Sequence, residues 1–182
     1  MKILIFTEGT ILTNKRWVGI PRKKIVEQVQ KWSSLSKRQL DKLQKAGLAP
    51  SLKYFMDSVP IGNCVKKIDA WKNQGATIFY LTSRRKPEEV TAIRSILDKC
   101  KFPEGELLFR KEVEDYKDVA EKVTPDVIVE DDCESIGGEE EMTYPNIRPD
   151  LKTRIRSVVV KEFSGIDVLP DDIAELLKND NK

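Results

Sequence analysis

The residues from Pro125 to Gly138 constrain the fold of this 182-residue chain more than any others. An apolar, β-branched run, Val127 to Val129, stands directly before three acids, Glu130, Asp131 and Asp132. Such a run is typical of a strand buried on both faces, and open α/β sheets keep their sites at the carboxyl ends of such strands. Adjacent carboxylates repel one another unless a hard cation takes them as ligands. The stretch therefore predicts either a magnesium site or an acidic turn in solvent.

Apolar runs alternate with helical patterns through the rest of the chain. The other predicted strands are Lys2–Phe6, Ala76–Leu81, Glu106–Phe109 and Ser157–Val160, with the central one starting at Pro125. Segments of about ten residues with helical spacing separate most of these runs. Strands that alternate with helices through short connections favour a parallel sheet covered by helices. We therefore predict an α/β fold with three layers in one domain, residues 1–182.

Residues 13–58 interrupt this alternation. Ile25, Val26 and Val29 recur at helical spacing, and a second helical pattern follows Ser36, a candidate N-cap. We expect these residues to form a helical cap insertion over one edge of the domain. Its basic residues, together with Arg84 and Arg85, could clamp an anionic ligand or be solvated: Lys15, Arg16, Arg22, Lys23 and Lys24.

The composition excludes several classes of function. With 32 basic and 30 acidic residues, no global field draws the chain to nucleic acid or to a membrane surface. No apolar run approaches the roughly 20 residues that span a bilayer, and the start shows no signal-peptide pattern, so the expected location is cytoplasmic. The chain has no histidine, which excludes histidine-dependent triads and histidine-ligated zinc. Cys133 is a poor candidate nucleophile because the neighbouring carboxylates raise the pKa of a thiol.

Polar residues follow the ends of the predicted strands. Glu8, Thr82 and Ser83, Lys117, and the acids at 130–132 come at or near four successive ends. In a parallel sheet these ends meet at one edge. A hydroxyl donor, a lysine and a pair of acids that can hold magnesium are together what a phosphoryl group needs. The set predicts a site for a small phosphorylated compound.

These motifs resemble those of the haloacid dehalogenase (HAD) superfamily of phosphotransferases, in its Rossmann-like form with a helical cap. Members begin with an apolar strand followed by Asp-x-Asp-Gly-Thr; here Phe6 and Glu8 stand in place of the two aspartates. The resemblance implies that Glu8 acts as acid or base. It assigns phosphate binding to Thr82 or Ser83 and to Lys117, with Lys111 a weaker candidate. It assigns magnesium to Glu130 and Asp131, or to Asp131 and Asp132 if the register shifts by one.

Phe6 is the largest departure from that pattern. A phenyl ring can neither attack phosphorus nor bind magnesium, so we expect only weak binding of Mg²⁺. Two hypotheses therefore stand. The chain is a magnesium-dependent hydrolase of a small phosphorylated compound, or it is a non-catalytic module that binds a phosphorylated ligand or a protein partner on the same scaffold.

Overall fold

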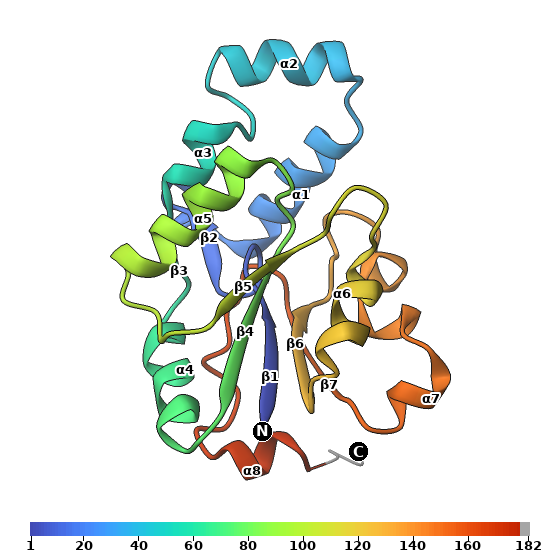
Figure 1. Ribbon diagram of the computed structural model, residues 1–182. Coiled ribbons are helices and arrows are strands. Elements are labelled where there is room, and N and C mark those ends of the chain that lie inside the picture. Colours follow the sequence, from blue (N-terminus) through green and yellow to red (C-terminus); the bar gives the residue numbers. More distant parts are fainter. Residues whose placement is uncertain (179–182) are drawn as a thin grey trace.

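A computed structural model describes residues 1–178 of the chain and shows a five-stranded parallel sheet (Figure 1). The strands lie in the order β5-β4-β1-β6-β7. Their bounds are β1 Lys2–Phe6, β4 Thr77–Thr82, β5 Glu106–Phe109, β6 Val127–Asp131 and β7 Arg156–Val160. The predicted parallel α/β sheet is confirmed, and the first strand lies at its centre.

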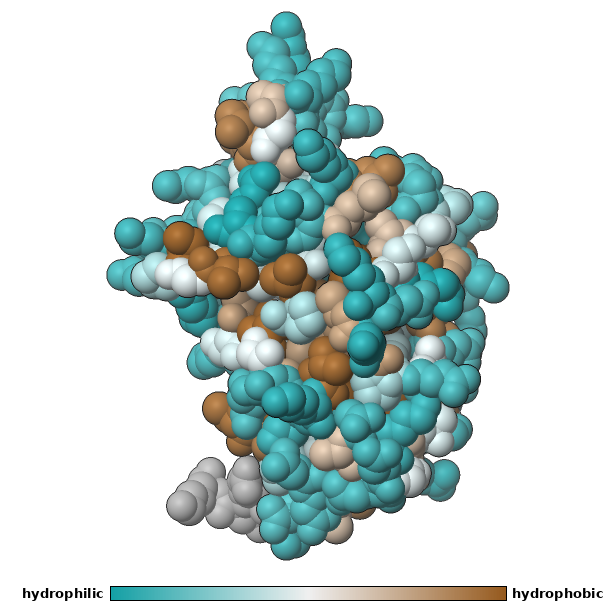
Figure 2. Space-filling model, turned by 90° about the vertical axis from the view of Figure 1, so that its left-hand side faces the viewer, coloured by the Kyte–Doolittle hydropathy of each residue, from teal (hydrophilic) through white to brown (hydrophobic). Residues whose placement is uncertain are grey.

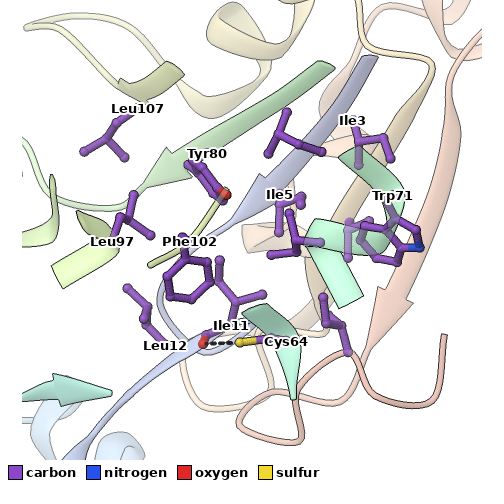
Figure 3. Packing of buried hydrophobic residues seen from close by; sticks show 14 of the residues in the cluster. Ile3, Ile5, Ile11, Leu12, Cys64, Trp71, Tyr80, Leu97, Phe102 and Leu107 are labelled. Carbon is purple, nitrogen blue, oxygen red and sulfur yellow. Dashed lines mark hydrogen bonds between the residues drawn. The ribbon is translucent and has the colours of Figure 1, made fainter. Parts of the chain in front are cut away.

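Side chains of β1 alternate between two hydrophobic clusters on opposite faces of the sheet. Ile3 and Ile5 pack on one face against α4 (Cys64–Asn73) and α5 (Pro87–Lys99), together with α8 (Ile173–Leu176). Leu4 packs on the other face against α6 (Tyr116–Val123) and α7 (Pro149–Lys152). Figure 1 shows these two helical layers on either side of the strands, and Figure 3 shows Ile3, Ile5 and Trp71 packed together on the first face. The predicted three layers follow from this alternation.

Two strands end later than the sequence predicts. β4 continues through Thr82, which pairs with Phe109, and β6 continues through Asp131, which pairs with Val160. The polar residues there remain in the sheet because a neighbouring strand supplies ladder partners on one side. As a result, Thr82 and Asp131 occupy fixed positions on strands instead of positions in loops.

The segment predicted to be an insertion begins and ends with two short strands that pair with each other. β2 (Leu12–Asn14) pairs antiparallel with β3 (Ser58–Pro60), and between them lie a 3-10 turn (Lys15–Trp17), α1 (Arg22–Ser33), α2 (Lys37–Lys45) and α3 (Leu52–Met56). Ser36 caps α2 as predicted, accepting a hydrogen bond from the backbone N–H of Gln39. No residue of α2 is buried, and Figure 2 shows a hydrophilic tip at this end of the molecule.

Short elements complete the chain between β6 and β7. Two 3-10 turns, Gly138–Glu141 and Tyr144–Asn146, precede α7.

Among residues 1–178, none of the helices has the length and apolar character needed to cross a bilayer.

Candidate functional site

A cavity of about 250 Å³ lies at the carboxyl ends of β1, β4 and β6. Four residues predicted from the sequence line it: Glu8, Ser83, Glu130 and Asp131. Thr82, fully buried, donates its hydroxyl to Glu8. Residues of α1, α3 and the segment before α3 close the opposite side of the cavity: Val29, Trp32, Pro50, Tyr54 and Phe55. The strand ends thus supply polar groups, and the helices after β2 supply apolar ones.

The carboxylate of Glu8 is held by the end of β4. Its Oε1 accepts a hydrogen bond from the Thr82 hydroxyl (2.6 Å), and its Oε2 accepts one from the backbone N–H of Ser83 (3.0 Å). The Thr7 hydroxyl donates to Oε2 as well (2.7 Å), and Arg84 Nε lies 3.4 Å from Oε1. The carboxylate of Glu8 therefore contacts two hydroxyl groups, a backbone amide and a guanidinium at once.

A tight turn after Glu8 brings β1 close to β6. Gly9 adopts φ +81°, and the carbonyl of Thr7 accepts hydrogen bonds from the N–H groups of Ile11 and Leu12. The hydroxyl of Thr10 then donates to Asp131 Oδ2 (2.7 Å). A Cβ at Gly9 would lie 2.8 Å from that oxygen, so only glycine fits this approach.

An aromatic pair, Phe6 and Tyr116, lies at the end of β1. The ring of Phe6 packs edge-to-face on Tyr116 with centroids 5.2 Å apart. The guanidinium of Arg110 lies 3.6 Å from the Tyr116 ring centroid. The Arg110 side chain is largely buried. Burial raises the pKa of Tyr116, so its hydroxyl stays neutral. This part of the cavity wall is apolar and carries no nucleophile.

Lys117 does not line the cavity that holds Glu8. It lies in a separate, smaller hollow between the start of α6 and residues 140–146, together with Arg110 and Asp115. Lys111 is exposed, and its backbone N–H donates to Glu114. Among the described residues, Arg84 is therefore the one basic side chain that lines the cavity.

Three carboxylates converge beside the turn at Gly9. Asp131, Asp132 and Glu162 each place an oxygen within 4.8 Å of the others. Burial acts to raise the pKa of Asp132, but a hydrogen bond from the backbone N–H of Glu162 (3.0 Å) and ion pairs with Lys161 (3.0 Å) and Arg22 (3.5 Å) hold this pKa below its usual range. Glu130, the other predicted ligand, lies outside this group because its carboxylate accepts hydrogen bonds from the N–H groups of Thr143 and Tyr144.

Sequence reasoning missed Glu162. It follows β7 by two residues, so the rule that sites gather at the carboxyl ends of parallel strands was the signal that could have found it. Glu162 accepts hydrogen bonds from the Ser135 hydroxyl (2.6 Å) and backbone N–H (2.8 Å). Burial raises its pKa to about 7, and the nearby charges of Asp131 and Asp132 act in the same direction.

Glu162 should make the stability of the protein depend on pH. The unfolded chain releases this proton near pH 4.5 and the folded chain near pH 7, so stability falls as the pH rises between these values. The full effect is roughly 3 kcal/mol. Denaturant unfolding at several pH values should show that the free energy of unfolding falls less with rising pH in Glu162→Gln than in the unaltered protein. The same fall in both proteins would contradict this expectation.

The acidic group fits a hard cation, though not tightly. Carboxylate oxygens are the ligands that Mg²⁺ prefers, and Asp131, Asp132 and Glu162 would hold it. Both oxygens of Asp131 and both of Glu162 already accept hydrogen bonds, and Asp132 is neutralised by two basic side chains. A bound Mg²⁺ would neutralise negative charge at the strand ends. These competing partners support the weak binding predicted from the sequence.

The basic residues between β2 and β3 pair with the protein itself. Arg22 donates to the carbonyl of Glu162 (2.7 Å) and to the carboxylate of Glu134, and Lys15 pairs with Asp57 (2.7 Å). Arg16 lies over the ring of Tyr54. None of the basic residues from Lys15 to Lys24 lines the cavity in the part of the chain that the structure describes. The contacts of Arg22 instead fasten α1 to the loops after β6 and β7.

Cys133 follows the acidic group and is inert as a nucleophile. Burial, together with the charges of Asp131 and Glu130, raises the pKa of its thiol far above the usual range. The thiol therefore stays protonated, as the sequence led us to expect.

Comparison with known proteins supports the fold. No protein-family model and no curated protein sequence matches the chain. A solved structure from Thermotoga maritima, described as a "putative beta-phosphoglucomutase", is similar over 97% of this chain and 96% of its own, with a TM-score of 0.50 and 14% sequence identity. Likeness at this identity bears on the fold alone. With its central β1 and its helices on both faces, the parallel sheet gives this chain a three-layer Rossmann-like α/β fold.

Proposed function

We propose that this protein binds a small molecule in the cavity at the strand ends and does not transfer phosphoryl groups. One observation carries the proposal: the carboxylate of Glu8 occupies the hydroxyl of Thr82, the N–H of Ser83 and the guanidinium of Arg84. Hydroxyl, amide and guanidinium donors are the groups that recognise a phosphate. A phosphorylated ligand could use them only after Glu8 had left.

Two other positions support a binding role. Phe6 offers no atom that could attack phosphorus, and it is packed against Tyr116. Lys117, which the resemblance assigns to the phosphate, lies in a different hollow. A protein that lacks a nucleophile and a second cation at this place has lost both covalent catalysis and much of the charge stabilisation that phosphoryl transfer requires.

The alternative is a magnesium-dependent hydrolase of a small phosphorylated compound, in which Glu8 activates a water. The group formed by Asp131, Asp132 and Glu162 favours it, because a metal there could neutralise a phosphate. This route requires Glu8 to give up at least one of its four contacts before it can act as acid or base.

Assays with a panel of phosphomonoesters and Mg²⁺ separate the two functions. We expect no turnover above background, and the same background rate in Asp131→Asn. Turnover by the unaltered protein that disappears in Asp131→Asn would contradict the binding role and establish the hydrolase.

Phe6→Asp is expected to remain inactive in the same assay. The new carboxylate restores a nucleophile at the end of β1, but Glu8 still fills the donors that would position a phosphate. Loss of the edge-to-face contact with Tyr116 should also destabilise the protein by about 1–3 kcal/mol. An increase in turnover of a hundredfold or more would show that Glu8 moves aside readily.

A further inference from the structure

Aromatic side chains form part of the cavity wall. Six rings line it: Phe6, Trp32, Tyr54, Phe55, Tyr116 and Phe163. Several are fixed by mutual contacts. Trp32 and Tyr54 meet edge-to-face with centroids 6.0 Å apart, and the indole N–H of Trp17 donates to the Tyr54 hydroxyl (2.7 Å). Rigid aromatic faces bind the apolar body of a ligand and attract positive charge.

The ionisable side chains that line the cavity are mainly acidic. Among the described residues, five acidic side chains line it against one basic side chain, Arg84: Glu8, Glu130, Asp131, Glu141 and Glu162. Arg84 is already engaged, since its Nε lies 3.4 Å from Glu8 and its guanidinium lies 4.3 Å from the Phe55 ring centroid. The cavity therefore has no basic side chain left for an anion.

Asp131 and Glu162 lack a compensating cation. Each accepts hydrogen bonds from hydroxyl and N–H groups, but neither forms an ion pair within residues 1–178. Their neighbour Asp132, by contrast, pairs with Lys161 and Arg22. Buried carboxylates without a cation are costly, and a positively charged ligand would relieve this cost.

From the cavity's aromatic walls and unpaired carboxylates, we propose that its ligand is a small organic cation with an apolar body, such as an arylalkyl ammonium. The ammonium group lies against Asp131 and Glu162, and the apolar body lies between the rings contributed by β1, α1 and α3. A free divalent cation would satisfy the carboxylates but would leave the aromatic walls without a partner. An anionic ligand would meet five carboxylates. This inference rests on the binding role proposed above.

Calorimetric titration of the unaltered protein with three probes of similar shape tests the inference. The probes are phenethylammonium, the neutral 2-phenylethanol and the anionic phenyl phosphate. We expect phenethylammonium to bind about tenfold or more tightly than the alcohol, and phenyl phosphate not to bind. Equal binding of the cation and the alcohol, tighter binding of intact phenyl phosphate, or no binding of phenethylammonium at millimolar concentration would overturn the proposal.

Matched variants locate the bound cation. Asp131→Asn and Glu162→Gln keep the shape of each side chain and should each weaken phenethylammonium binding about tenfold. Glu104→Gln, whose side chain is 99% exposed away from the cavity, should leave it unchanged. Unchanged affinity in both cavity variants would overturn the proposal. Hydrolysis of phenyl phosphate would instead contradict the binding role itself, so the two failures are distinguishable.

Discussion

Replacing Glu8 with alanine is expected to give this protein an affinity for inorganic phosphate that the unaltered chain lacks. The substitution frees the Thr82 hydroxyl, the Ser83 N–H and the Arg84 guanidinium together. Thr82 is fully buried, and an unsatisfied buried donor costs about 1–3 kcal/mol, so the variant should be less stable without an anion. Phosphate should restore that stability by accepting the same hydrogen bonds.

Thermal unfolding in phosphate and in chloride at equal ionic strength measures this effect. At a phosphate concentration about 100 times Kd, binding stabilises the folded state by about 2.7 kcal/mol, which raises Tm by roughly 5–10 °C for a chain of this size. The unaltered protein and Glu106→Ala should show no such rise, since Glu106 is exposed at the start of β5, at the opposite end of the strands. A phosphate-dependent rise in the unaltered protein would show that Glu8 does not compete with phosphate.

Gly9→Ala is expected to cause the largest loss of stability from adding a single methyl group near the site. The residue adopts φ +81°, where a side chain costs about 1–2 kcal/mol. In addition, the new Cβ would lie 2.8 Å from Asp131 Oδ2 and 3.2 Å from Glu162 Cγ. Overpacking of this kind typically costs a further 1–3 kcal/mol. The clash should also displace two carboxylates of the acidic group.

Gly19→Ala is the matched control for this prediction. Gly19 adopts φ +77°, nearly the same backbone conformation, but no atom lies within 4 Å of a Cβ built there. Denaturant unfolding should therefore show a loss of about 1–2 kcal/mol for Gly19→Ala and a clearly larger loss for Gly9→Ala. Equal losses of stability in the two variants would mean that the close approach of Gly9 to Asp131 does not add to the cost of the substitution.

The strands and their common edge could be predicted from the sequence because their signals are local. An apolar β-branched run such as Val127–Val129 predicts a buried strand wherever it occurs. Because the carboxyl ends of parallel strands share one edge, the predicted sheet brings Glu8, Ser83 and Asp131 together, and in the structure all three line one cavity. The N-cap at Ser36 was likewise a short-range signal.

The chemistry of the site could not be predicted in the same way. The position of the Glu8 carboxylate depends on how far its side chain, one methylene longer than that of aspartate, reaches toward Thr82 and Ser83. Spacing along the chain does not encode that distance. Lys117 is one residue from Tyr116 on α6, and the helix turns the tyrosine toward Phe6 and the lysine toward another hollow. Trp32, Tyr54 and Phe55 line the cavity because α1 and α3 pack over the strand ends. The sequence predicts helices in this segment but not how they pack.

A crystal structure of the unaltered protein grown with both phosphate and Mg²⁺ tests the central claim most directly. The claim is that Glu8 permanently occupies the donors at the end of β4. We predict that its carboxylate will still accept hydrogen bonds from the Thr82 hydroxyl and the Ser83 N–H, with no phosphate on either group. A phosphate bound to these donors, with Glu8 rotated away and a metal ion held by Asp131, would contradict the claim.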